Sequence, residues 1–152
     1  MNRFTTPRLG ALCLVLKALY HAEANDAPTP GQAMFRHPAL SDTRIAFVHA
    51  GDLWTVPKAG GLATHLTSAK GEETNPRFSP DGKTIAFTAN YDGSEDVHTI
   101  PANGGAPVRI TFHGGADRLL SWFPDGRSLL FTSKRESFTE RVSRFFQIVS
   151  PF

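Results

Sequence analysis

The sequence contains a single cysteine among its 152 residues, Cys13, close to the start of the chain. A disulfide within the chain is therefore excluded as a source of stability. Net charge is also small, because 16 basic residues stand against 14 acidic ones. Once residues 1–24 are set aside, 13 residues of each sign remain. Balanced charge without a basic cluster argues against nucleic acid or an anionic membrane as a partner.

Long apolar segments are missing as well. The mostly apolar run at residues 9–20 is too short to span a bilayer. It follows a basic N-terminus and precedes Ala22-Glu23-Ala24, an order that is typical of a secretory signal peptide. We predict a signal peptide over residues 1–24, cleaved after Ala24, and a flexible leader over residues 25–34. We expect a secreted or bacterial periplasmic protein with no membrane span after cleavage.

Common motifs of catalytic and binding sites are absent from the sequence. It has no G-x-S-x-G nucleophile turn, no zinc-protease helix motif and no phosphate-binding glycine loop. The histidines lack the short spacing of metal ligands. They are His21, His37, His49, His65, His98 and His113. We therefore predict no catalytic, cofactor-binding or metal-binding residues, no cofactor, and no enzymatic activity for this chain alone.

One loop alternates oxygen-bearing side chains around Gly93, as the start of a calcium loop does. These side chains belong to Asn90, Asp92, Ser94 and Asp96. A calcium loop ends in a glutamate that binds the ion through both oxygens, but Pro101 stands near that position. We favour a solvated hairpin loop. Asp96 and its counterpart Asp52 begin equivalent segments, and we expect both to bond turn amides rather than to act as paired acids.

The sequence is built from a repeat that contains a tight turn between two β-rich runs. Residues 78–87 (FSPDGKTIAF) return as residues 122–131 (WFPDGRSLLF), and in weaker form as residues 40–47. Ile45 and Ile85 are 40 residues apart, and the next equivalent, Leu129, follows 44 residues later. Pro-Asp-Gly favours a hairpin turn. Short strands and turns repeating at about 40 to 45 residues are typical of propeller blades.

This period predicts an all-β fold, a partial β-propeller of four-stranded antiparallel blades with about two and a half blades. Blade one spans residues 35–70, blade two residues 71–113, and an incomplete blade three residues 114–152. We expect strands at 35–41, 44–48, 52–56, 63–67, 76–79, 84–89, 96–100, 107–111, 119–123, 128–132 and 145–149. The fourth strand of blade three is absent, and Lys134–Arg141 is expected to form an exposed loop.

Aromatic residues recur at equivalent places in the repeat. They are Phe47, Trp54, Phe78, Phe87, Trp122 and Phe131. Large aromatic side chains between blades are how this architecture coheres, so we expect them in the core rather than on a ligand platform. Leu53 and Thr55 should lie on one face of their strand, and Trp54 and Val56 on the other. Bulk on both faces suits a blade packed between two neighbours.

The repeats resemble those of TolB-type and tricorn-type propellers, in residues 52–57 (DLWTVP) and 80–87 (PDGKTIAF). More specific segments resemble the opening blades of bacterial tricorn protease homologues. They are residues 35–41 (FRHPALS), 71–79 (GEETNPRFS), 115–118 (GADR) and 133–141 (SKRESFTER). Two positions depart from the family pattern, since Ser41–Arg44 lacks the Pro-Asp-Gly turn and His98 replaces an aromatic residue.

The resemblance implies a six-bladed N-terminal propeller, followed in full-length relatives by a second propeller, a PDZ-like module and a serine peptidase domain. We therefore expect an N-terminal propeller fragment of a secreted tricorn-like peptidase that gates or scaffolds peptide or protein substrates. None of the family's catalytic residues has a counterpart in this chain. The alternatives are a free-standing TolB-like interaction module and a nonfunctional truncated product. Open blade edges also favour self-association.

Overall fold

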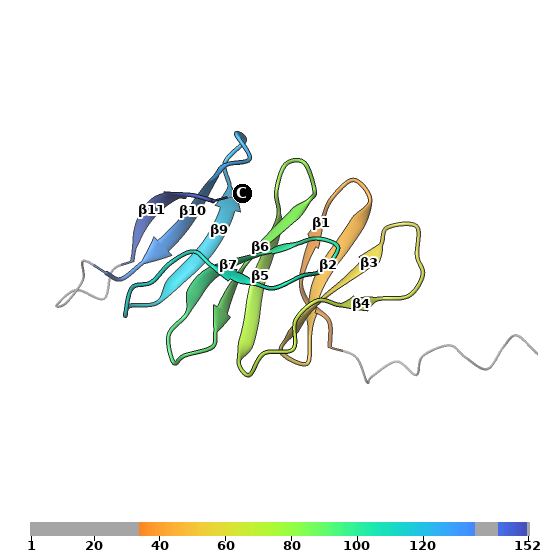
Figure 1. Ribbon diagram of the computed structural model, residues 1–152, viewed down its shortest axis with the longest axis horizontal. Helices are drawn as coiled ribbons and strands as arrows, with labels where there is room; N and C mark the ends of the chain where they lie inside the picture. The colour runs from red at the N-terminus through yellow and green to blue at the C-terminus, as the bar shows by residue number, and fades with distance from the viewer. Residues whose placement is uncertain (1–33, 136–142, 152) are drawn as a thin grey trace, which may run out of the picture. The chain divides into compact units, whose positions relative to one another are not determined.

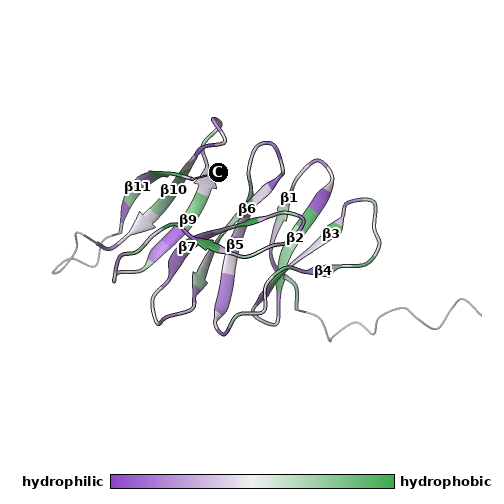
Figure 2. Ribbon diagram, viewed as in Figure 1, coloured by the Kyte–Doolittle hydropathy of each residue, from purple (hydrophilic) through white to green (hydrophobic). Residues whose placement is uncertain are grey.

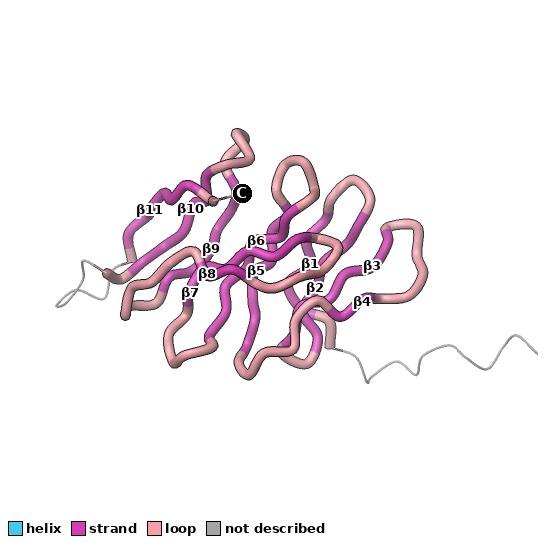
Figure 3. Tube along the Cα trace, in the orientation of Figure 1, coloured by secondary structure: helices cyan, strands magenta, loops and turns pink. Residues whose placement is uncertain are grey.

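The computed structural model describes residues 34–135 and 143–151, and all of their regular structure is β-strand (Figure 3). The predicted signal peptide and nearly all of the leader lie outside the described residues. The strands form three antiparallel sheets in chain order (Figure 1). The fold is therefore all-β, as the repeat predicted. In the described residues, no helix is long and apolar enough to cross a membrane.

The first two sheets have four strands each, and the third has three. Blade one contains β1 Arg36–Leu40, β2 Arg44–His49, β3 Asp52–Pro57 and β4 Thr64–His65. Blade two contains β5 Glu72–Phe78, β6 Thr84–Asn90, β7 Asp96–Pro101 and β8 Val108–Arg109. Blade three contains β9 Asp117–Trp122, β10 Ser128–Ser133 and β11 Arg144–Val149. Each strand pairs with the next along the chain, as in propeller blades.

The Pro-Asp-Gly segments form the predicted hairpin turns. The Gly82 N–H donates to the Ser79 carbonyl at 2.8 Å, and Gly126 repeats this bond to Phe123 at 3.0 Å. Both glycines have positive φ, +70° and +67°, which a residue with a side chain rarely adopts. Asp81 completes the first turn by accepting hydrogen bonds from the Ser79 hydroxyl and the Lys83 N–H. The turn chemistry was therefore predicted correctly.

Two kinds of strand differ from the predicted bounds. The first strand of blade two begins at Glu72 rather than Pro76, because a bulge between Thr74 and Arg77 carries the strand past the proline. The fourth strands are only two residues long. In blade one the cause is a side chain, since the Leu53 N–H donates to Thr67 Oγ1 at 2.8 Å instead of to the backbone. Thr111 does the same for Val97 at 3.0 Å.

Two apolar clusters hold the blades together. The cluster between blades one and two includes Ala46, Leu53, Leu66, Ile85, Phe87 and Ile100. The cluster between blades two and three includes Ala86, Val97, Ile110, Leu119, Leu129 and Phe131. The first strands are also neighbours, because β5 contacts both β1 and β9. The sheets thus pack face to face in sequence, with their first strands on the same side.

The predicted aromatic core is divided between buried and half-buried positions. Phe87 and Phe131 are fully buried, as expected. Phe78 and Trp122 are half-buried against the two clusters. Trp122 also donates from Nε1 to the carbonyl of Arg77, which ties blade three to blade two. Phe47 and Trp54 are half-buried on the face of blade one that lies away from blade two.

Candidate functional site

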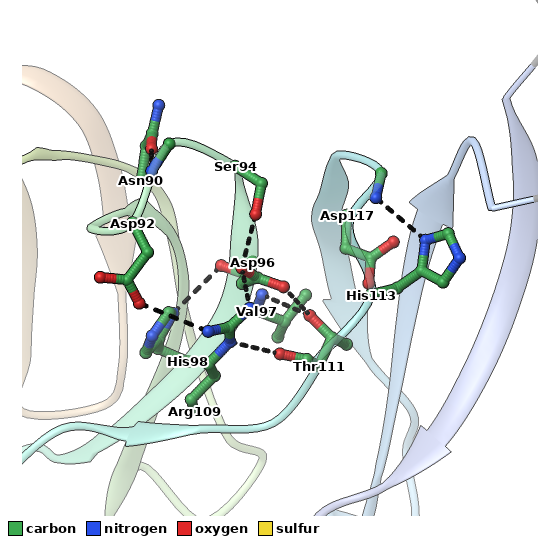
Figure 4. Close-up of polar contacts among 12 residues, drawn as sticks. Asn90, Asp92, Ser94, Asp96, Val97, His98, Arg109, Thr111, His113 and Asp117 are labelled. Atoms are coloured by element: carbon green, nitrogen blue, oxygen red, sulfur yellow. Dashed lines mark hydrogen bonds and ion pairs between the residues drawn. The ribbon is translucent and has the colours of Figure 1, made fainter.

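The loop between β6 and β7 holds the metal candidates of the sequence, and Figure 4 shows how they are arranged. Asn90 turns back to its own loop, where Oδ1 accepts from the Gly93 N–H at 3.0 Å. Ser94 donates from its hydroxyl to Asp96 Oδ2 at 3.1 Å. Asp92 is exposed, whereas Asp96 is buried at the start of β7. The side-chain oxygens therefore bond within the loop.

Arg109, on β8, fills the space between the two carboxylates (Figure 4). Its Nη2 lies 2.7 Å from Asp96 Oδ2, and its Nη1 lies 3.4 Å from Asp92 Oδ2. Nε donates to the carbonyl of Thr111 at 2.7 Å. A guanidinium in this position supplies the positive charge that a calcium ion would bring. Within the described residues, no group of three or more histidine, cysteine, aspartate or glutamate side chains is placed to hold a metal ion.

Asp96 is the centre of a buried network, so the interpretation as a solvated loop fits the exposed residues Asn90 and Asp92 but not Asp96. The Thr111 hydroxyl donates to Asp96 Oδ1 at 3.1 Å, and Thr111 Oγ1 in turn accepts from the Val97 N–H at 3.0 Å. The expectation that Asp96 bonds turn amides was wrong, since its carboxylate meets the side chains of Ser94, Arg109 and Thr111. The fourth strand and the residues after it bring Arg109 and Thr111 to the start of β7, whereas Ser94 lies in the loop just before that strand.

Blade one contains the same arrangement 44 residues earlier. Asp52 Oδ2 lies 2.8 Å from His65 Nε2, and Thr67 binds the Leu53 N–H. His65 stands where Arg109 stands in blade two, and its ring stacks on Trp54 with centroids 4.2 Å apart. The prediction for Asp52 was thus wrong for the same reason. The two aspartates do not form a catalytic pair, because each binds a side chain of its own fourth strand.

A buried acid lies at each of the two junctions between successive blades, and sequence reasoning missed both acids. Glu73 and Asp117 occupy the same register position, opposite Ala89 and Ser133, and neither is exposed. Figure 2 shows the hydrophilic ends of β5 and β9 to which they belong. Their N–H groups donate to the carbonyls of Gly51 and Glu95 in the preceding blade. A spacing of 44 residues between two acids at the start of a strand was the available signal.

Glu73 has neutral partners. The Thr67 hydroxyl donates to Oε2, and the Tyr91 hydroxyl donates to Oε1 at 2.6 Å. Burial raises the pKa of Glu73, although these two hydrogen bonds act in the opposite direction. Burial, together with the Glu73 carboxylate, also raises the pKa of Tyr91. When Glu73 is protonated, the three side chains of Glu73, Thr67 and Tyr91 carry no charge.

Asp117 has a charged partner instead. Arg135 Nη2 lies 2.7 Å from Asp117 Oδ2, and its guanidinium stacks on Phe131 and Phe146 at 5.0 and 4.8 Å from the ring centroids. Asp117 Oδ1 has no hydrogen-bond partner among the described residues. Lys134–Arg141 was expected to be an exposed loop, but Arg135 is half-buried in this pair. Residues 136–141 lie outside the described part of the chain.

The histidines take separate structural roles. His98 stacks on Phe87 and contacts Tyr91, and burial lowers its pKa. His113 Nδ1 accepts from the Gly115 N–H at 3.0 Å (Figure 4). His49 lies beside Phe35 and Trp54. His37 adopts a positive φ of 52° in the first strand, and His21 lies outside the described residues.

Comparison with known proteins decides the family. The model of the tricorn protease N-terminal β-propeller domain matches residues 32–150. The chain belongs to this family. The order of its strands within each blade is that of the partial β-propeller predicted from the repeat.

Two relatives share part of this sequence. Tricorn protease homolog 1 of Streptomyces coelicolor is 34% identical over 68 residues, which cover 45% of this chain and 6% of that protein. A protein of Sulfurisphaera tokodaii named Tricorn-like protease N-terminal subunit is 33% identical over 54 residues, covering 36% of this chain and 28% of the relative. The matched region is therefore a small part of each of these family members.

Solved structures confirm the fold. The crystal structure of the tricorn protease superposes with a TM-score of 0.68 and 23% identity, covering 76% of this chain and 12% of that one. TolB from Acinetobacter baumannii superposes with a TM-score of 0.61 and 23% identity, covering 77% of this chain and 30% of that one. Both structures thus match about three quarters of this tricorn-family chain.

Proposed function

We propose that this chain supplies opening blades of the N-terminal propeller of a secreted tricorn-like serine peptidase, where it gates or scaffolds peptide and protein substrates. The observation that carries the proposal is the family match over residues 32–150. The name of the Streptomyces relative, a tricorn protease homologue, supports the peptidase context. In this proposal the catalytic residues belong to other domains, and the blades act by shape.

The arrangement of the first strands supports gating. The first strands β1, β5 and β9 are neighbours, and in a propeller one edge of every blade faces the central channel. A polar hollow of about 500 Å³ lies between the turn at Ser41–Thr43 and the turn at Ser79–Gly82, at one end of β1 and β5. A narrow channel admits an extended chain more readily than a folded domain, which is the selectivity a gate needs.

A chimaera tests the gating role. The corresponding blades of Tricorn protease homolog 1 are replaced by residues 34–150 of this chain, and cleavage of a short fluorogenic peptide and of a folded protein is measured. We expect the peptide to be cleaved and the folded protein to resist. The same chimaera with Phe87→Asp, which places a charge in the junction between blades one and two, should cleave both. Equal treatment of the folded protein by the two chimaeras would contradict gating.

A free-standing interaction module is the second candidate, and the likeness to TolB favours it. In that case loops at one end of the blades would grip a protein partner. The same chimaeras separate the two functions, because a module without a gating role leaves selectivity unchanged. Phe112→Asp is the matched control, since Phe112 is exposed and its replacement leaves both junctions intact.

Export is a separate part of the proposal and rests on residues 1–24. The chain is expressed in a bacterial host, and the N-terminus of the periplasmic product is sequenced. We expect Asn25 as the first residue. A variant with Ala22→Arg and Ala24→Arg should remain uncut, because signal peptidase requires small residues at these positions. An unprocessed native chain in the cytoplasm would contradict export.

A further inference from the structure

The turn that joins β1 to β2 is shorter than its counterparts in the other two blades. In blade one a backbone hydrogen bond of 2.9 Å closes the turn across residues 42–43. The matching bonds of blades two and three close the turn across residues 80–83 and 124–127. Blade one is therefore two residues shorter here, and the polar hollow of about 500 Å³ lies between its short turn and the turn of blade two.

Arg44, the first residue of β2, also departs from the repeat, because the other two blades have Thr84 and Ser128 in its place. The strand registers make these three positions equivalent. Arg44 shares with Ala46 the side of β2 that packs toward blade two, since alternate residues of a strand point to the same face. Its guanidinium is half-buried and has no hydrogen bond or ion pair with a described residue. The described part of the fold therefore does not use this charge, although burial removes part of its water.

Arg44 lines a second hollow, of about 410 Å³, between blades one and two. The other lining residues belong to blade two and are Gly82, Lys83, Ala102 and Asn103. Lys83 contributes an ammonium group on a side chain that is 84% exposed, and Asn103 contributes a side-chain amide. Both walls of the hollow lie within one junction between successive blades. The hollow is thus bordered by two positive charges and a polar amide.

These groups suit a carboxylate as ligand. A guanidinium presents two parallel N–H donors that match the two oxygens of a carboxylate, and the opposite charges strengthen both hydrogen bonds. Lys83 adds a second positive charge, because its ion pair with Asp81 spans 3.9 Å between two exposed side chains and is weak in water. A bound carboxylate would supply the partner that Arg44 lacks among the described residues.

The polar hollow beside the short turn gives room for the rest of the ligand. Gly82 lines both hollows, so they adjoin each other. Each falls within the usual size of a ligand site, roughly 300–1,000 Å³. The polar hollow is lined by Asp42 and Asp81 and by the hydroxyl-bearing Ser41 and Thr43. Their oxygens can accept hydrogen bonds from peptide N–H groups, and the two carboxylates disfavour a ligand with a second negative charge, such as phosphate.

We propose that Arg44 and Lys83 bind a carboxylate of a short peptide, whose chain lies in the adjoining polar hollow. The source of the peptide rests on the proposed function, because a tricorn-like peptidase acts on peptides. The C-terminus of a peptide and the side chain of an aspartate or glutamate both present the required pair of oxygens. Binding is a property of blades one and two, so it can be measured on this chain without a peptidase.

Fluorescence anisotropy of short peptides, each with a dye at its N-terminus, tests the site on the full chain. The first peptide is tetra-alanine with a free C-terminus, and the second is its C-terminal amide. The third is an amide that ends in aspartate, so its one carboxylate is a side chain. A carboxylate at either place should tighten binding roughly tenfold or more over the tetra-alanine amide. The tighter of the two carboxylate peptides identifies the source of the carboxylate.

Substitutions at Arg44 test the residue itself. Arg44→Thr introduces the residue that blade two has at this position, and it should weaken binding of the tighter peptide by roughly 10- to 100-fold. Arg44→Lys keeps the charge without the two parallel donors, so its loss should be smaller. Arg127→Thr is the matched control, because Arg127 is exposed in the corresponding turn of blade three and lines neither hollow. Circular dichroism verifies that each variant keeps its strands.

The outcomes separate this site from the proposed gate. If neither carboxylate tightens binding, or if Arg44→Thr binds as the native chain does, the carboxylate site is overturned. A chimaera that fails to gate, with carboxylate binding to the chain intact, would overturn the gating role and leave the site standing. A chimaera that gates, with no carboxylate binding to the chain, would overturn the site alone.

Discussion

The two junctions between blades solve one structural problem with different chemistry. Each begins with a buried acid on the first strand of the following blade, Glu73 in one case and Asp117 in the other. Glu73 is bound by the hydroxyls of Thr67 and Tyr91, whereas Asp117 is bound by the guanidinium of Arg135. The acid at the first junction is therefore bound by neutral hydroxyls and has its pKa raised by burial, whereas the acid at the second junction is held in an ion pair within blade three.

The positions of the partners match as well. Tyr91 and Arg135 are 44 residues apart, as are Glu73 and Asp117. Each partner also contacts an aromatic ring or imidazole on the third strand, Tyr91 with His98 at 4.9 Å between centroids and Arg135 with Phe146 at 4.8 Å. The repeat thus preserves where a polar link is made, while the charge of the link differs. A repeat can therefore hold its geometry while its response to pH and salt changes from junction to junction.

Truncating the central aromatic residue of each junction should have the largest effect. We expect Phe87→Ala and Phe131→Ala to lower the free energy of unfolding by about 3–5 kcal/mol each, because both rings are fully buried. Phe131→Ala should be the more harmful of the two, since it also removes a ring on which Arg135 stacks. Urea unfolding followed by circular dichroism measures the change. Phe112→Ala, at an exposed ring, should change stability by less than about 0.5 kcal/mol.

Removing the polar partner of each buried acid should destabilise the two junctions to different extents. Arg135→Met leaves Asp117 buried without its cation, and we expect a loss of about 1.5–3 kcal/mol. Tyr91→Phe should cost about 1 kcal/mol, because Glu73 keeps the hydrogen bond from the Thr67 hydroxyl. The same unfolding measurement gives both values. A larger loss for Tyr91→Phe than for Arg135→Met would contradict the assignment of the ion pair to the second junction.

The strands and turns could be predicted from the sequence because local chemistry determines them. Pro80-Asp81-Gly82 specifies its turn without help from the rest of the fold, and the 44-residue period places the other blades. The short fourth strand could not be predicted, because it ends where the Thr67 side chain replaces a backbone acceptor. That substitution depends on a contact 14 residues away in the sequence.

The polar links were missed for a similar reason. Glu73 and Asp117 appear in the sequence as ordinary charged residues at the start of a strand. Packing of one blade on another buries them, whereas the pairing of the first strand with the second brings Tyr91 and Arg135 to them within the same blade. The sequence left a calcium loop at Asp92 and Asp96 as the weaker alternative to a solvated hairpin loop, because it could not reveal that Arg109 lies between them.

The proton of Glu73 gives the first junction its own pH dependence. Burial raises the pKa of Glu73 above its ordinary value of 4.5, so the folded chain binds this proton more tightly than the unfolded chain. Its stabilising contribution is complete below the ordinary value and is lost as pH rises through the raised pKa. The slope for one group is at most about 1.4 kcal/mol per pH unit.

Glu73→Gln should remove this slope, since glutamine does not titrate. Urea unfolding from pH 4 to pH 8 should show the native chain losing stability relative to the variant as pH rises. Glu72→Gln is the matched control, because Glu72 is its exposed neighbour and pairs with Arg36. Parallel pH curves for the native chain and Glu73→Gln would exclude the proton link at the first junction.

The smallest loss of stability is expected for the Asp52–His65 pair of blade one, in contrast to the Asp96–Arg109 pair of blade two. Asp52 and His65 are both partly exposed, so water can replace their bond, whereas Asp96 is buried beneath Arg109. We expect His65→Phe, which keeps the stacking on Trp54 and removes the bond to Asp52, to cost less than about 1 kcal/mol. His65→Ala removes both contacts and should cost more in the same urea titration. If His65→Phe were as costly as His65→Ala, the bond to Asp52 rather than the stacked ring would hold the fourth strand in blade one.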